Sequence, residues 1–103
     1  MREVLDYLDT HAHRPIGPAT IAAIANAPAR EVVEALRRRG TSPARRLRRA
    51  RLLGAHHDLH AAHPQAGTTV STIAARWGFT HLARFRHAYA AAFDEQPEDT
   101  LRR

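Results

Sequence analysis

The chain has 103 residues, enough for one domain or two very small subdomains and too few for a large cofactor-binding fold. All 16 of its basic residues are Arg, against 10 acidic residues, and this excess of positive charge indicates an acidic partner. The absence of Cys excludes disulfides, cysteine-based zinc sites and thiol nucleophiles. No apolar run approaches the roughly 20 residues that span a bilayer, and the N-terminus resembles no signal peptide. We therefore expect no membrane partner and a cytoplasmic location.

The first half of the chain is divided into short helices by Gly and Pro. Apolar residues at helical spacing predict a first helix over residues 2–13, stopped by Pro15. A second helix is expected over residues 17–26 and a third over 28–39, before Gly40, which is suited to a left-handed helix end. Two short helices joined by about three residues predict a helix-turn-helix.

The second half begins with a long helix. Ser42 is a favourable N-cap, and the absence of any strong breaker before Pro64 predicts a linking helix over residues 43–63, about 30 Å long. Shorter helices are expected over 69–78, capped by Thr69, and over 80–93, capped by Thr80, followed by a final turn over 97–101. We therefore predict an all-α fold of seven helices.

A weak internal repeat relates the sequence of the second and third predicted helices to that of the fifth and sixth. This pattern predicts two helix-turn-helix subdomains, residues 1–42 and 64–103, joined by the linking helix over residues 43–63. Some ten residues of the second half then resemble a known signature, that of the second helix-turn-helix of AraC-type (AraC/XylS) transcription regulators: Val70, Ile73, Ala74, Trp77, Gly78, Phe79, Phe85, Tyr89, Phe93 and Pro97.

The resemblance implies a sequence-specific regulator that binds double-stranded DNA. Its recognition helices would be residues 28–39 and 80–93, placed in successive major-groove segments. Those segments lie roughly 34 Å apart, a separation comparable with the length of the linking helix. Regulators of this family usually carry a sensor domain, and 103 residues leave no room for one, so we expect none in this chain. At position 94 the family usually has Gly, so Asp94 alters the end of the last long helix.

Family placement and helical spacing assign most base reading to the second recognition helix. The expected base-reading residues are Leu82, Ala83, Arg84, Arg86 and His87. Arg side chains can donate two hydrogen bonds to the edge of guanine, and the small apolar side chains can contact thymine methyl groups.

The first recognition helix is expected to place Arg30, Val33 and Glu34 toward DNA, although the carboxylates of Glu31 and Glu34 would repel phosphates. Phosphate contacts are expected from an Arg-rich stretch over residues 37–51 and from the start of the second recognition helix, namely from Arg37, Arg38, Arg48 and His81. A solvated surface in an Arg-favouring genome is the alternative for this stretch.

Three other groups of residues combine a possible functional role with a simpler structural one. His56, His60 and His63 share one helical face, but with only Asp58 nearby we predict polar packing and no metal or other cofactor. The aromatic residues at positions 77, 79, 85, 89 and 93 are expected in the core and not in a base-stacking surface. The acidic residues of positions 94–99 are either a contact for RNA polymerase or solvated surface.

No catalytic motif is present, so we do not expect an enzyme. The alternative to a DNA-binding regulator is a helical protein-interaction module that has lost DNA reading in its first half. The carboxylates of Glu31 and Glu34 motivate this alternative.

Overall fold

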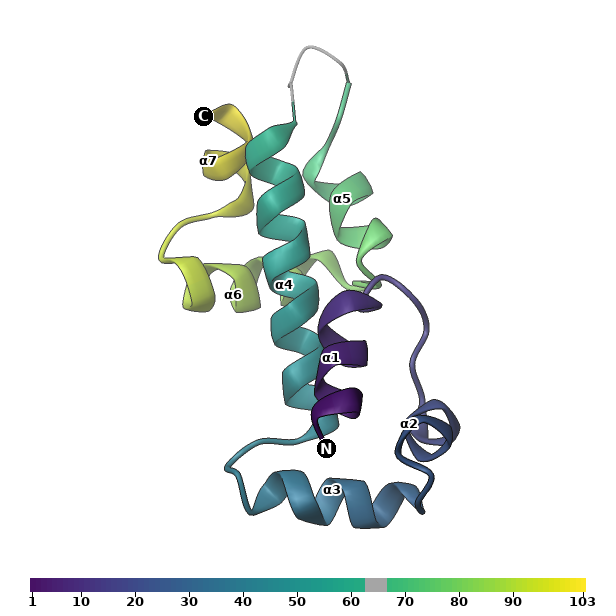
Figure 1. Ribbon diagram of the computed structural model, residues 1–103. Coiled ribbons are helices and arrows are strands. Elements are labelled where there is room, and N and C mark those ends of the chain that lie inside the picture. The colour runs from purple at the N-terminus through teal and green to yellow at the C-terminus, as the bar shows by residue number, and fades with distance from the viewer. Residues whose placement is uncertain (63–66) are drawn as a thin grey trace. The chain divides into compact units, whose positions relative to one another are not determined.

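The computed structural model describes residues 1–62 and 67–103 (Figure 1). These residues form seven helices and no strand, which confirms the predicted all-α fold. The helices are α1 (Arg2–Thr10), α2 (Pro18–Ala25), α3 (Ala29–Arg37), α4 (Pro43–Ala61), α5 (Val70–Arg76), α6 (Leu82–Phe93) and α7 (Pro97–Arg102). The chain divides into two compact units, Met1–Ala50 and Arg51–Arg103, which we call unit 1 and unit 2.

The core of unit 1 is small and built from aliphatic side chains of its first three helices. Its buried members are Val4, Leu8, Ile21, Val32 and Leu36, against which Leu47 of α4 packs. A bidentate ion pair joins α1 to the start of α4, with Arg46 Nε and Nη2 donating to Asp9 at 3.2 and 3.0 Å. The hydrogen bond to Asp9 raises the pKa of the Arg46 guanidinium, which therefore stays charged. Unit 1 is thus held by a compact apolar cluster and by the ion pair that joins α1 to α4.

Local capping residues set the ends of the helices in unit 1. Asn26 ends α2 in the left-handed conformation, with φ 53°, and Gly40 adopts φ 77° after α3. The backbone N–H of Arg45 donates to Ser42 Oγ at 3.1 Å, so Ser42 caps α4 as the sequence predicts. The short segment from Asn26 to Pro28 connects α2 and α3, which gives unit 1 its helix-turn-helix.

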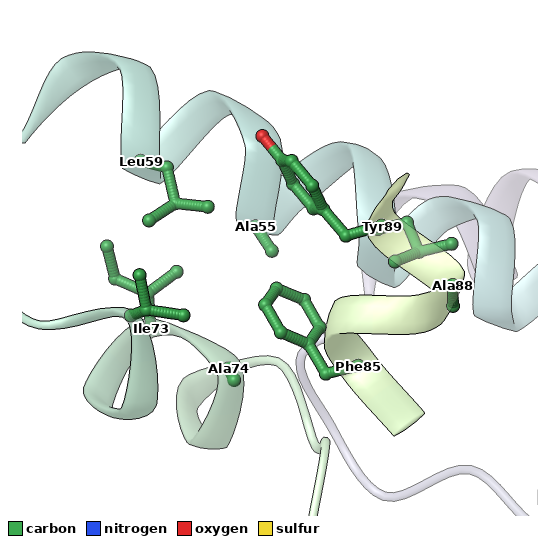
Figure 2. Close-up of a cluster of buried hydrophobic side chains, with 9 residues drawn as sticks. Ala55, Leu59, Ile73, Ala74, Phe85, Ala88 and Tyr89 are labelled. Carbon is green, nitrogen blue, oxygen red and sulfur yellow. The ribbon is translucent and has the colours of Figure 1, made fainter. Parts of the chain in front are cut away.

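The core of unit 2 is larger and contains the aromatic side chains. Figure 2 shows Phe85 and Tyr89 of α6 facing Ala55 and Leu59 of α4, with Ile73 of α5 beside them. Phe85 and Tyr89 are fully buried, and their rings lie 5.6 Å apart at an angle of 50°. Trp77, Phe79 and Phe93 are partly buried and pack against this cluster, so all five aromatic residues contribute to the core as predicted.

A close approach between α4 and α5 explains the glycine inside α4. The ring of Trp77 lies directly over Gly54, where an added Cβ would be 2.4 Å from Trp77 Cη2. Trp77 Nε1 donates to Asp58 Oδ2 at 2.8 Å, and Arg76 pairs with the same oxygen at 3.0 Å. Gly54 is therefore required by packing, although glycine is a poor helix former.

Several predicted helix ends were wrong. The first helix ends at Thr10 and not at residue 13, because the backbone of His11 leaves the helical region and the Thr10 hydroxyl donates to the carbonyl of Asp6. The predicted recognition helices 28–39 and 80–93 are shorter, at Ala29–Arg37 and Leu82–Phe93.

Thr80 does not cap α6. The ring of Phe79 packs on Phe85, with centroids 4.8 Å apart, and the chain stays extended through His81, which occupies the N-cap position without a side-chain hydrogen bond. The linking helix ends at Ala61, and position 63, its predicted end, lies outside the described residues, as do 64–66.

Candidate nucleic-acid interface

The exposed face of α6 contains four of the five residues expected to read bases. Because Phe85, Ala88 and Tyr89 are buried, the opposite side of the helix faces outward, and it presents Ala83 and His87 in line at a spacing of four. Arg84 and Arg86 flank this line on opposite sides, and both are exposed. The line continues to Ala91, which is also exposed and which the sequence reasoning did not include. The two alanines of this line, with Arg residues on either side, permit close approach of a flat or grooved surface.

Leu82, the fifth expected residue, lies differently. It is half-buried and packs against the core of unit 2. Much of its side chain therefore contacts the core. Helical spacing in the sequence, which places Leu82 beside the outward face, could not reveal this contact.

Arg86 is oriented by a carboxylate from the next helix. Its Nε donates to Glu98 Oε1 of α7 at 2.6 Å, and the two side chains are 45% and 35% exposed. A guanidinium has five N–H donors, so this single bond leaves both terminal amino groups of Arg86 available for a ligand. Arg84 has no side-chain partner in the described part of the chain.

Behind this face, a chain of hydrogen bonds crosses the core and connects three helices. His56 Nδ1 lies 2.7 Å from the Tyr89 hydroxyl, which lies 2.7 Å from Thr100 Oγ1, and Thr100 in turn donates to Glu95. Because Thr100 donates to a carboxylate, Tyr89 donates to Thr100 and His56 donates to Tyr89, so the Nδ1 of His56 carries a proton. Burial raises the pKa of the Tyr89 hydroxyl.

The acidic end of this chain is held by two donors. Glu95 accepts hydrogen bonds from Thr100 and from Arg103, and the hydrogen bond from Thr100 is the first cause of the lowered pKa of this carboxyl group. His56 also stacks on Phe93, with ring centroids 4.2 Å apart. These contacts fix α6 and α7 against α4 and make the outer face of α6 a rigid platform.

The expected contact residues of α3 are all exposed. Arg30 and Glu34 lie on the side opposite the buried Val32 and Leu36, and Val33 lies at the edge between the two sides. Val33 is 43% exposed and lines an apolar hollow of about 370 Å³ between α2, α3 and the start of α4. On this face the charges of the helix are largely balanced.

The balance comes from local pairing. Glu34 Oε1 accepts from Arg37 Nη2 at 2.7 Å, one turn along the helix. The carboxylate that the sequence suggested would repel phosphate is thus partly neutralised, and Arg37, an expected phosphate contact, is engaged by it. The other expected phosphate contacts, Arg38, Arg48 and His81, are exposed.

Two negative findings concern the described residues only. Residues 1–62 and 67–103 contain no group of three or more His, Asp or Glu side chains arranged to hold a metal ion, and His63 lies outside them. Within the same residues, no helix combines the length and the apolar character needed to cross a membrane.

Comparison with known proteins decides the family. A family model described as a helix-turn-helix domain matches residues 21–103. A crystal structure of a probable AraC family transcriptional regulator from Rhodopseudomonas palustris is 34% identical, with a TM-score of 0.87, and the match covers 98% of this chain and 93% of that one. The chain belongs to the AraC family. Its helix-turn-helix units are those of a DNA-binding transcription regulator.

The curated relatives that this chain matches are considerably longer than it is. A probable thc operon regulatory protein of Rhodococcus erythropolis is 36% identical over 103 residues, and the XylDLEGF operon transcriptional activator of Pseudomonas putida is 31% identical over 101. The matches cover 99% and 96% of this chain, which spans 31% of the length of each relative.

The AraC-type signature describes the core and turns of unit 2 more than its exposed face. Ile73, Phe85 and Tyr89 are fully buried, and Gly78 adopts φ 84° in the turn between α5 and α6. The exposed residues of α6 lie between these signature positions. The signature therefore reports the fold and leaves the exposed side chains of α6 open.

Proposed function

We propose that the chain binds double-stranded DNA sequence-specifically, with α3 and α6 as its two recognition helices in adjacent major-groove segments. The observation that supports this most is the outer face of α6, with Ala83 and His87 between two exposed Arg residues on a rigid helix. A flat guanidinium beside small side chains suits the guanine edge, which accepts two parallel hydrogen bonds. With this function we propose a cytoplasmic location.

Within α6 we assign base reading to Arg84 and Arg86, with contributions from Ala83 and His87. Arg86 would present its terminal amino groups, because Glu98 holds its Nε. Leu82 would contribute less than the other positions, because it packs on the core.

In unit 1 we assign a weaker base-reading role to Arg30, Val33 and Glu34. Phosphate contacts would come from Arg37, Arg38, Arg48 and His81, which are all exposed. His81 lies at the N-terminus of α6, where the helix dipole favours an anion. These contacts would fix the register without reading sequence.

The experiment that tests this proposal is selection of binding sites from a pool of random duplexes at two salt concentrations. Enrichment of a site that spans two major-groove segments about one turn apart would support reading by both helices. A single short half-site would restrict reading to α6. Salt-sensitive binding without enrichment would contradict sequence-specific recognition.

Single substitutions then separate base contacts from phosphate contacts. Arg84→Ala is expected to weaken binding to the selected site by about 1 to 3 kcal/mol and to relax preference at one or two base pairs. Arg38→Ala should weaken binding to all sequences alike and reduce the slope of log affinity against log salt by about one. Arg2→Ala removes an exposed Arg from the start of α1 and is the matched control.

A protein-interaction module is the second candidate function, and the carboxylates of Glu31 and Glu34 on the exposed side of α3 favour it. Binding to nucleic acid that is absent or insensitive to salt would support this candidate. A proposed contact with RNA polymerase rests mainly on Asp94, because its neighbours Glu95, Glu98 and Asp99 are paired within unit 2.

A further inference from the structure

Unit 1 contains a basic cavity that is separate from the exposed face of α3. Its volume is about 510 Å³, within the range of small-molecule sites. It lies where the chain passes from the end of α3 through Gly40 into the first turns of α4. Its lining includes Leu36, Arg39, Thr41, Arg45, Arg46 and Arg49.

The positive charge of this cavity is only partly compensated. Arg46 is paired with Asp9 in bidentate geometry. In the part of the chain that the structure describes, Arg39, Arg45 and Arg49 have no carboxylate partner, and all three are exposed. Three unpaired guanidinium groups beside one neutralised pair repel each other, and an anion among them would relieve that repulsion.

The remaining lining suits a ligand with a polar and an apolar part. The half-buried Leu5 gives the cavity an apolar side, and the half-buried Thr41 supplies a hydroxyl group. Guanidinium groups match the oxygens of a phosphate group with paired N–H donors. An excess of three positive charges suits a multiply charged phosphate better than a single carboxylate.

We propose that this cavity is a binding site for a phosphate-bearing ligand. The phosphate would come either from the backbone of bound DNA or from a free phosphorylated small molecule. Only the first source rests on the proposed function, because a free phosphate compound could bind whether or not the chain reads DNA. Arg39, Arg45 and Arg49 belong to the Arg-rich stretch over residues 37–51, and the individual phosphate contacts assigned above fall on other members of it, Arg37, Arg38 and Arg48.

The free source is tested by isothermal titration of the full chain with inorganic pyrophosphate at low salt. We expect saturable binding that Arg45→Gln and Arg49→Gln each weaken about 13-fold or more, because each removes a charged hydrogen bond of about 1.5 kcal/mol or more. Arg2→Gln, which removes one charge from the start of α1, should leave binding unchanged. Both cavity residues are exposed and unpaired, so thermal unfolding should show these variants fully folded.

The DNA source is tested with the same variants on duplexes. If the cavity holds a backbone phosphate, each variant should weaken binding to all sequences and lower the slope of log affinity against log salt by about 0.9. When the salt concentration is raised from 50 to 200 mM, each variant should therefore lose about 3.5-fold less affinity than the unsubstituted chain. Arg2→Gln should again match the unsubstituted chain.

The outcomes separate this inference from the proposed function. Pyrophosphate binding that depends on Arg45 and Arg49 supports the site even if no duplex binds. An effect of the same substitutions on duplexes alone supports the site and identifies the phosphate as that of DNA. If both variants behave like Arg2→Gln in both assays, the inference is wrong, and a site selected by the unsubstituted chain would still support the proposed function.

Discussion

Replacing Gly54 by Ala should destabilise unit 2, although the same change stabilises most helices. In an exposed helix, Ala is favoured over Gly by about 1 kcal/mol. Here the new Cβ would lie 2.4 Å from Trp77 Cη2 and 2.5 Å from Cζ2 and Cζ3 of the same ring. Carbon atoms in contact prefer roughly 3.5 to 4.0 Å, so the ring has to move by about 1 Å or more.

Two terms oppose the gain in helix propensity. Overpacking of this kind costs about 1 to 3 kcal/mol. Movement of the ring also breaks the 2.8 Å hydrogen bond from Trp77 to the carboxylate of Asp58, at a further cost of about 1.5 to 3 kcal/mol. After subtraction of the roughly 1 kcal/mol gained from Ala, we expect Gly54→Ala to lower the free energy of unfolding by about 3 kcal/mol. The melting temperature should fall by about 12 °C or more.

The assay is direct because Trp77 is the single Trp of the chain. Its fluorescence reports both the displacement of the ring and the unfolding of unit 2 in denaturant. In a Trp77→Phe background, followed by circular dichroism, Gly54→Ala should be nearly neutral or stabilising, which gives a coupling energy of about 2 kcal/mol or more. A Gly54→Ala variant as stable as the unsubstituted chain would refute the reasoning.

Three further predictions concern the end of unit 2. Asp94→Gly should raise the free energy of unfolding by about 1 kcal/mol in denaturant titrations, because Asp94 ends α6 with φ 58° and carries a negative charge beside the C-terminal dipole. Tyr89→Phe should lower it by about 1 to 3 kcal/mol, because the two partners of the buried hydroxyl lose their hydrogen bond. Thr100 and Arg103 lower the pKa of Glu95, so its contribution to stability is present above the unfolded pKa of about 4.3 and is lost as the pH falls through the folded value. Melting temperatures measured below pH 5 should therefore fall more steeply for the unsubstituted chain than for Glu95→Gln.

Local signals in the sequence were enough to predict most of the fold. In an N-cap, a side-chain oxygen accepts from the backbone N–H three positions later, and the predicted caps at Ser42 and Thr69 are both formed. Thr72 N, for example, donates to Thr69 Oγ1 at 3.1 Å. The spacing of Phe85 and Tyr89 likewise predicted the buried side of α6, which both residues confirm. Thr80 failed as a cap because a tertiary contact, the packing of Phe79 on Phe85, overrides local preference.

The surroundings of the candidate site could not be predicted, because they join residues far apart in the sequence. Glu98 is 12 positions from Arg86, and Tyr89 is 33 positions from His56. Nothing in the sequence alone indicates that these side chains meet. For Arg86, several other acidic residues could equally have been the partner. The pairing decides which donors of Arg86 stay available, and so it bears directly on how α6 would read a base pair.

The charges of α3 and α6, the two proposed recognition helices, favour different roles for the two units. On α3, the charges of Arg30, Glu31, Glu34 and Arg37 cancel, and two of these residues pair with each other. On α6, two Arg residues face outward, and the carboxylate that holds one of them comes from another helix. Unit 1 would therefore gain its affinity for DNA mainly from the Arg residues beyond α3, which attract phosphates without reading sequence. Sequence discrimination would fall to α6, where Glu98 orients Arg86 and the packed inner face of the helix fixes the backbone that carries both Arg residues.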